Sequence, residues 1–395
     1  MSEYAEINPD GASVGPAVKR RFSFASAPED FRLESGAGLG PITLAYETFG
    51  NLNSGKTNAI LVLHALSGDS HAAGAYSETD ARPGWWDIMI GPGKGIDTDK
   101  YFVICSNVLG GCMGSTGPSS VNPETGRPYG LDFPMVTIGD MVRAQRRLVH
   151  SLGIERLLCV IGGSMGGMQA LDWALRYPDM TALAIPIAAT SRHSALAIAF
   201  NETARQAIMA DPAWLLGDYY GTGKPVTGLA VARMIGHITY LSDEAMREKF
   251  GRRLKDKSDF SFSFDAEFEI ESYLHYQGKK FVERFDPNSF LFLTRAADYF
   301  DLAREWGNGS LVKAFSRARA RFLVISFASD WLYPSYQSRE IVRALKKNNA
   351  APSFVELDAK WGHDAFLLPD ARLSAVIGGF LTKAGTAAGG KPHAS

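Results

Sequence analysis

Cysteine is scarce in this sequence: Cys105, Cys112 and Cys159 are the only three among 395 residues. Their number is odd and no two have a Cys-x-x-Cys spacing, so neither a disulfide framework nor a thiolate zinc site is expected. Cys105 and Cys159 lie inside apolar runs and are expected to be small buried core residues. Low cysteine use favours a reducing, cytoplasmic compartment.

The sequence also lacks an excess of charge of either sign. The net charge is −1, so no overall field recruits nucleic acid or an anionic membrane. No stretch reaches the ~18 apolar residues of a membrane span, and the N-terminus lacks the apolar core of a signal peptide. The ends of the chain, residues 1–19 and 385–395, are polar or small and are expected to be disordered tails.

What the sequence does contain is a series of short apolar runs bounded by turn residues. Continuous apolarity, rather than alternation, is typical of strands buried on both faces. The runs cover residues 59–65, 101–109, 157–161, 183–189 and 322–327, with a further candidate strand at 354–357. Helical patterns lie between them, so the sequence predicts an α/β fold with a mostly parallel sheet. Residues 31–34 and 41–46 flank a glycine-rich turn and predict an antiparallel hairpin at the sheet edge.

Three helices have recognisable signals. Thr137-Ile-Gly-Asp140 resembles an N-terminal capping box and is followed by an amphipathic pattern. Further along the chain, residues 232–254 and 265–285 are rich in helix formers and each predicts a helix.

The character of the chain changes between residues 191 and 301, where no strong buried-strand run occurs. We interpret residues 191–301 as a helical lid insertion in a core made of residues 20–190 and 302–384. An insertion at this place would cover the C-terminal edge of the strands, where open α/β sheets bind ligands.

The strongest chemical signal is Gly162-Gly163-Ser164-Met165-Gly166, between an apolar run and a helical pattern. A Gly-x-Ser-x-Gly motif alone is weak, but strand, tight turn and helix are the setting of a nucleophile elbow. The elbow presents a serine oxygen beside a helix N-terminus, which favours developing negative charge. The sequence therefore predicts Ser164 as a covalent nucleophile of an α/β-hydrolase fold.

A serine nucleophile needs a base, and the base needs a carboxylate that orients it. This fold uses the chain order Ser, Asp or Glu, then His. Asp330 follows the apolar run at 322–327 and His363 follows the candidate strand at 354–357, so both match the order. His64 and His71 precede the serine and do not fit. The other histidines are expected to be surface, core or tail residues: His150, His193, His237, His275 and His393.

An oxyanion hole requires two backbone N–H groups aimed at the tetrahedral oxygen. One is expected from Met165, directly after the nucleophile. The other is expected from Leu66, in the loop His64-Ala-Leu-Ser-Gly-Asp that follows an early strand.

With these residues placed, the sequence resembles the homoserine O-acyltransferase family of the α/β-hydrolase superfamily. The resemblance covers about residues 40–380. The matching stretches are HALSGDSHAAG, PGWWDIMIGPGKGIDTDKYFVICSN, LGGCMGSTGPSS, IGGSMGGMQAL, FNETARQAI, VARMIGHITY, ESYLHYQGKKF and WGHDAFLLP. It implies a cytoplasmic homodimer with a helical lid that acylates the hydroxyl of L-homoserine in methionine biosynthesis.

The resemblance also implies that Arg233 and Asp364 bind homoserine. Homoserine is a zwitterion, so its carboxylate suits a guanidinium and its ammonium suits a carboxylate. Val231 stands where such enzymes often have Leu, a mild departure. We expect a ping-pong reaction through an acyl-serine, with acyl-CoA as a co-substrate and with no metal or other cofactor.

The acyl group is predicted from Leu332, two positions after Asp330. The resemblance implies that succinyl-using relatives typically have an arginine at this position, in an Asp-Trp-Arg pattern. Leu332 instead suits a methyl group and favours acetyl-CoA. Arg339 could still reach the site and serve succinyl-CoA. A serine esterase, an L-serine O-acyltransferase and a catalytically inactive binding module on the same fold remain as alternatives.

Overall fold

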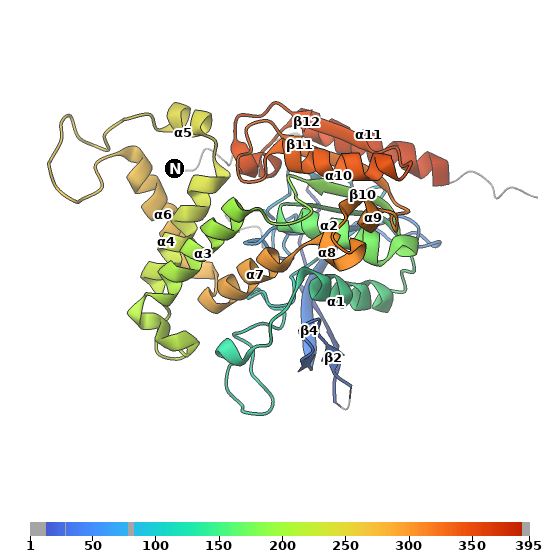
Figure 1. The fold of residues 1–395 in the computed structure, drawn as a ribbon, viewed down its shortest axis with the longest axis horizontal. Coiled ribbons are helices and arrows are strands. Elements are labelled where there is room, and N and C mark those ends of the chain that lie inside the picture. Colours follow the sequence, from blue (N-terminus) through green and yellow to red (C-terminus); the bar gives the residue numbers. More distant parts are fainter. Residues whose placement is uncertain (1–12, 28, 78–82, 389–395) are drawn as a thin grey trace, which may run out of the picture.

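The computed structural model describes residues 13–27, 29–77 and 83–388, with only the backbone for 384–388. Its centre is an eight-stranded sheet (Figure 1). In order across the sheet the strands are β1 (Arg20–Phe24), β4 (Ile42–Phe49), β8 (Phe102–Ser106), β5 (Ala59–Leu63), β9 (Leu157–Gly163), β10 (Thr181–Ile187), β11 (Arg321–Phe327) and β12 (Ser353–Leu357). The six strands from β8 to β12 run parallel, and β4 pairs antiparallel with both β1 and β8. The predicted α/β fold with a mostly parallel sheet is confirmed.

The middle strands are apolar throughout because both faces of the sheet are covered. Every residue of β5 and of β9 is buried. Leu61 belongs to the core on one face, beneath α1 (Ile138–Ser151), α2 (Met165–Arg176) and α10 (Ser335–Lys347). Its neighbour Ile60 belongs to the other face, which packs against α11 (Ala371–Ala388).

The capping box that begins α1 is confirmed. The N–H of Asp140 donates to the Thr137 hydroxyl oxygen at 3.1 Å, and Asp140 in turn accepts the Thr137 N–H at 3.1 Å. The apolar residues that follow, Met141, Val142, Leu148 and Val149, are fully buried.

The predicted hairpin between residues 31–34 and 41–46 is wrong. Phe31–Arg32 (β2) pairs with Gly38–Leu39 (β3) in a separate two-stranded sheet, because the chain already turns back at Gly36. Strand β4 pairs instead with β1, which lies earlier in the chain and forms the edge of the sheet.

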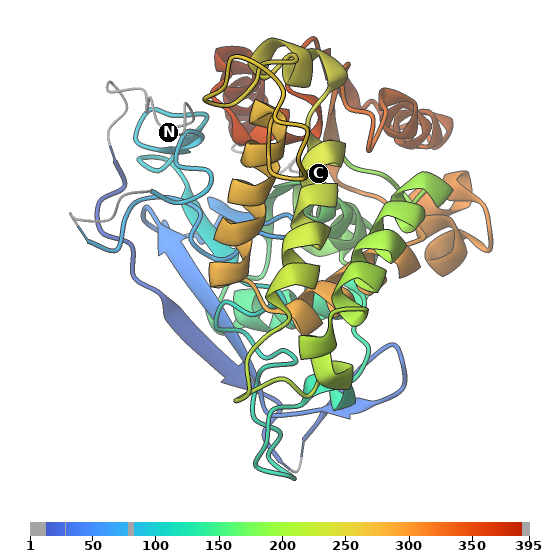
Figure 2. The same ribbon diagram turned by 90° about the vertical axis from the view of Figure 1, so that its left-hand side faces the viewer.

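Five α-helices follow β10 within the segment 191–301 that was interpreted as a lid. They are α3 (Ala195–Met209), α4 (Val226–Tyr240), α5 (Asp243–Lys249), α6 (Glu269–Arg284) and α7 (Pro287–Tyr299). Figure 2 shows α3, α4 and α6 side by side in front of the sheet. The single helix predicted over 232–254 is wrong: it breaks after Tyr240, because the Ser242 side chain caps the new helix α5 by accepting the Ala245 N–H at 3.0 Å.

The remaining elements are short. They are β6 (Ile90–Gly91), β7 (Ile96–Asp97), α8 (Leu302–Gly307), α9 (Leu311–Phe315) and the 3-10 helices η1 (Gly130–Asp132), η2 (Pro178–Met180), η3 (Pro212–Gly217) and η4 (Gly362–Leu367).

The two segments predicted as tails lie partly outside the described residues, at 1–12 and 389–395. Within the described part, Ala17 is buried and its N–H donates to the Ala75 carbonyl at 2.8 Å. At the other end, α11 continues to Ala388. In the part of the chain that the structure describes, no helix has the length and apolarity to cross a membrane.

Candidate active site

Ser164 occupies a sharp turn between β9 and α2. It has φ 58° and ψ −124°, in the left-handed half of backbone space that side chains rarely adopt. Its N–H donates to the Ile187 carbonyl at 3.0 Å, which ties the turn to the neighbouring strand β10. A strained serine at the C-terminal edge of the sheet is the geometry expected of a nucleophile elbow.

Close packing explains the glycines on either side of Ser164. A Cβ on Gly162 would lie 2.4 Å from the Leu63 carbonyl oxygen, and one on Gly166 would lie 2.0 Å from it. Leu63 is the last residue of β5, so the elbow is pressed against the end of this strand. Any side chain at these two positions would force the elbow and β5 apart.

Asp330 and His363 lie together as predicted. The Nδ1–H of His363 donates to Asp330 Oδ2 at 2.7 Å, and both side chains are buried. Asp330 Oδ1 accepts the backbone N–H groups of Leu332 and Tyr333 at 3.0 and 2.9 Å, which fixes the carboxylate. Nε2 of His363 has no hydrogen-bond partner among the described residues.

The surroundings of His363 favour its charged form. Burial lowers the pKa of His363, but the negative charge of Asp330 and the hydrogen bond to it raise this pKa more, so it lies above its ordinary value. A base with a raised pKa takes up a proton more readily, which suits a histidine that must receive one from a hydroxyl group.

The two N–H groups predicted for the oxyanion hole are available. Neither the N–H of Met165, at the first position of α2, nor that of Leu66 donates to any described residue. Gln169 links the segments that carry them, because its side-chain amide donates to the His64 carbonyl at 3.3 Å and to the Met165 carbonyl at 3.2 Å.

The ring of His64 holds the loop that contains Leu66. Val108 donates its N–H to His64 Nε2 at 3.1 Å, so the proton lies on Nδ1, which donates to the Ala65 carbonyl at 2.7 Å. Burial lowers the pKa of His64, consistent with this neutral ring. His64 thus positions the loop, a role that was not predicted from the sequence.

Arg233 and Asp364 supply opposite charges close to the histidine. The Arg233 guanidinium lies 4.8 Å from the Phe281 ring centroid and 5.7 Å from that of Tyr240, with a long hydrogen bond of 3.4 Å to the Ser67 hydroxyl. Asp364 makes no hydrogen bond within the described part of the chain. Burial raises the pKa of Asp364 above its ordinary value, and the positive charges of His363 and Arg233 offset only part of this rise. Both groups therefore retain capacity for a ligand.

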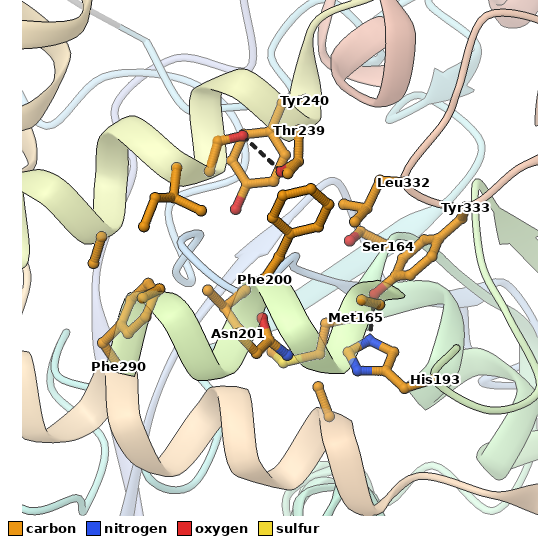
Figure 3. Close-up of a pocket in the computed structure, with 17 residues that line it drawn as sticks. Ser164, Met165, His193, Phe200, Asn201, Thr239, Tyr240, Phe290, Leu332 and Tyr333 are labelled. Carbon is orange, nitrogen blue, oxygen red and sulfur yellow. Dashed lines mark hydrogen bonds between the residues drawn. The ribbon is translucent and has the colours of Figure 1, made fainter. Parts of the chain in front are cut away.

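A cavity opens beside Ser164, beneath α3, α4 and α7 (Figure 3). Its volume is about 60 Å³. The residues around it are mainly apolar and include no Lys, Arg, Asp or Glu. They are Leu66, Ser164, Met165, His193, Ala197, Phe200, Asn201, Ala204, Ala232, Ile235, Gly236, Thr239, Tyr240, Phe290, Ala297, Leu332 and Tyr333.

Sequence reasoning missed the five other polar residues around this cavity, which are His193, Asn201, Thr239, Tyr240 and Tyr333. Tyr240 could have been found, because it lies seven positions after Arg233 and therefore on the same face of α4. Tyr333 lies only three positions after Asp330. His193, expected to be a surface or core residue, had no local signal and reaches the cavity from the loop after β10.

No described group of three or more His, Cys, Asp or Glu residues has a geometry that could hold a metal ion. The chemistry that this arrangement can perform is nucleophilic: an elbow serine, an Asp–His pair and two free N–H groups fit a covalent acyl-enzyme mechanism.

Comparison with known proteins shows the fold class to which the chain belongs. Residues 58–370 match the family model described as the alpha/beta hydrolase fold. Among solved structures, esterase E22 superposes with a TM-score of 0.84 at 34% identity, over 92% of this chain and 100% of that chain. The homoserine O-acetyltransferase from Bacillus anthracis superposes with a TM-score of 0.86 at 32% identity, over 93% of this chain and 98% of that one.

Sequence similarity narrows the class further. The homoserine O-acetyltransferase of Solidesulfovibrio magneticus is 66% identical over 385 residues, which cover 97% of each chain. The chain belongs to the homoserine O-acetyltransferase family within the α/β-hydrolase fold, and it is an acyltransferase.

Proposed function

We propose that the chain transfers the acetyl group of acetyl-CoA to the hydroxyl of L-homoserine, giving O-acetyl-L-homoserine and CoA, in methionine biosynthesis. The observation that carries the proposal is a Ser–His–Asp arrangement with Arg233 and Asp364 beside it. An esterase needs neither charge near its serine, whereas a zwitterionic acceptor needs both. The name shared by the relatives described above supports the same reaction.

In the first half-reaction the Ser164 oxygen attacks the thioester carbonyl carbon, and His363 Nε2 takes the proton of the serine hydroxyl. The N–H groups of Leu66 and Met165 stabilise the resulting oxyanion. The carbon–sulfur bond then breaks, and the CoA sulfur leaves with the proton held by His363. Asp330 stabilises the imidazolium throughout and holds the ring by accepting its Nδ1–H, which leaves Nε2 free to act as the base.

In the second half-reaction His363 accepts the homoserine hydroxyl proton while the hydroxyl oxygen attacks the acetyl carbon. The bond to Ser164 breaks, and the serine oxygen recovers a proton from His363. Arg233 holds the acceptor carboxylate and Asp364 its ammonium group, so the hydroxyl is aligned for attack. Transfer must outrun hydrolysis, and helices α3, α4 and α7 over the cavity exclude water.

Acetyl rather than succinyl is the acyl group that the cavity favours. Leu332 lines it, and a succinyl carboxylate buried there would have no cationic partner among the lining residues. Arg339, which could have served that role, lies in α10. It forms an ion pair with Glu356 of β12 and does not line the cavity.

Ester hydrolysis is the second candidate, because esterase E22 shares the architecture. A donor–acceptor matrix distinguishes these functions: acetyl-CoA and succinyl-CoA, each with L-homoserine, L-serine or water as the acceptor, with CoA release as the readout. We expect rapid release only with acetyl-CoA plus homoserine, and none from Ser164→Ala. Equal release without an amino acid would establish a hydrolase, and a preference for L-serine or succinyl-CoA would reassign the acceptor or the donor.

A further inference from the structure

A second aspartate–histidine pair approaches Ser164 from the lid side. His193 Nδ1 lies 3.1 Å from Asp298 Oδ1, and His193 Nε2 lies 2.6 Å from the Tyr333 hydroxyl. The three residues come from α7, from the loop after β10 and from the loop after β11, so tertiary structure alone brings them together. Figure 3 shows the Tyr333 hydroxyl between His193 and Ser164.

The carboxylate of Asp298, at the end of this series of hydrogen bonds farthest from Ser164, is held by two further residues. Asp298 accepts the Asn201 side-chain amide at 2.7 Å and forms an ion pair with Arg205 at 2.7 Å. Burial raises the pKa of Asp298, but the hydrogen bonds from His193 and Asn201 and the charge of Arg205 outweigh it, so this pKa lies below its ordinary value. Asp298 is therefore ionised and accepts the Nδ1–H of His193.

Proton positions follow from that carboxylate. With its proton on Nδ1, a neutral His193 offers only the lone pair of Nε2, so the Tyr333 hydroxyl donates to it. The lone pairs of the Tyr333 oxygen then face the cavity, where they can accept a further hydrogen bond. Burial raises the pKa of Tyr333 well above its ordinary value, so the phenol keeps its proton.

The hydroxyl of Ser164 is the group that faces this oxygen. Both residues line the cavity, and the Ser164 side chain is close enough to the phenol to lower the pKa of Tyr333, against the larger effect of burial. The Tyr333 ring also packs edge-on against His363, with ring centroids 5.0 Å apart. Because Asp330 binds the Tyr333 backbone N–H, the same turn holds the carboxylate behind His363 and the phenol beside Ser164.

We propose that Tyr333 is a further catalytic residue, whose oxygen accepts the Ser164 hydroxyl in the free enzyme and keeps the nucleophile within reach of His363 Nε2, to which this hydroxyl turns for the attack, and that His193 and Asp298 position the tyrosine. Two aspartate–histidine pairs thus converge on one serine: Asp330–His363 removes its proton, and Asp298–His193 orients it through the tyrosine. The inference rests on the proposed role of Ser164 as the nucleophile.

The first test is Tyr333→Phe, which keeps the buried ring and removes only the hydroxyl. We expect the rate of Ser164 acylation by acetyl-CoA, followed by rapid quench and intact mass, to fall about tenfold, the effect of one lost hydrogen bond. The KM for homoserine should remain within about twofold, because the acceptor site is untouched. Tyr299→Phe, an exposed tyrosine next to Asp298, is the matched control and should acylate at the normal rate.

The second test asks whether His193 acts through Tyr333. His193→Asn keeps an amide near the Nδ1 position for Asp298 but no longer reaches the phenol. In the otherwise unchanged enzyme, His193→Asn should slow the acylation of Ser164. In the Tyr333→Phe background it should change the acylation rate by less than about twofold. If His193→Asn destabilises the fold, as thermal melting would show, Asp298→Asn takes its place in the same double-mutant cycle.

Normal acylation by Tyr333→Phe would overturn the catalytic role of the tyrosine, and equal losses from His193→Asn in both backgrounds would overturn the positioning role of the histidine. Either result would leave the proposed function intact as long as Ser164→Ala remains unacylated and inactive. Acylation of Ser164→Ala would refute the proposed function itself.

Discussion

Replacing Gly166 with alanine tests whether the nucleophile elbow and the oxyanion loop depend on each other. The added Cβ would lie 2.0 Å from the Leu63 carbonyl oxygen, 2.8 Å from the Leu63 carbonyl carbon and 3.2 Å from the His64 carbonyl oxygen. All three are backbone atoms, so no side chain can rotate away. The end of β5 and the start of α2 must separate by about 1 Å to relieve the contact.

The expected loss follows from where that separation occurs. The loop with the Leu66 N–H begins directly after Leu63, and the Met165 N–H lies directly before Gly166. Donors must lie about 2.7–3.1 Å from the oxyanion, so a shift of about 1 Å removes one of them. Losing one donor costs about 10²–10³ in kcat, and the overpacking costs about 1–3 kcal/mol of stability.

The assay is steady-state CoA release with acetyl-CoA and homoserine, together with thermal melting. Gly379→Ala is the control, because nothing lies within 4 Å of a Cβ at that helical position of α11. It should keep full activity and gain slightly in stability. Gly166→Ala with unchanged kcat would refute the tight packing between elbow and loop.

Three further predictions address charge. Arg233→Lys should raise the KM for homoserine sharply and leave acylation by acetyl-CoA unchanged, because a point ammonium cannot replace a bidentate guanidinium; equal loss in both half-reactions would make Arg233 structural. Leu332→Arg should shift kcat/KM toward succinyl-CoA, and no shift would contradict the assigned wall of the cavity. Burial and neighbouring carboxylates raise the pKa of Glu305 to about 8 despite Arg176, above its ordinary 4.5. The folded chain therefore holds a proton that the unfolded chain has released, and stability should fall as pH rises from about 4.5 to 8. Glu305→Gln should flatten that fall in melting temperature and Glu283→Gln should not; identical pH profiles would contradict the assignment.

The sheet could be predicted from sequence because its strands are buried on both faces. The continuous apolar run 59–65, for example, contains β5 and the two residues after it. Because helical patterns separate such runs along the chain, parallel strands joined by crossover helices could be predicted. The edge was harder to predict. The segment Arg20–Phe24 is largely exposed, so its pairing with β4 left no apolar signal in the sequence.

The same contrast separates the parts of the site. Ser164, Asp330 and His363 follow strands, so chain order and strand ends suffice to bring them together. His193 and Tyr333 are 140 positions apart and meet only because α7 and the loops after β10 and β11 are packed around one cavity. A hydrogen bond of that kind depends on tertiary placement, and no local pattern encodes it.

The most direct test of the account is the mass of the enzyme mixed with acetyl-CoA and no acceptor, quenched on the millisecond scale. We expect one added acetyl group per chain, located on the peptide that contains Ser164, and its loss when L-homoserine is added, with O-acetyl-L-homoserine as the product. An acetyl group on another residue, or no acetylated enzyme under conditions in which CoA is released, would contradict it.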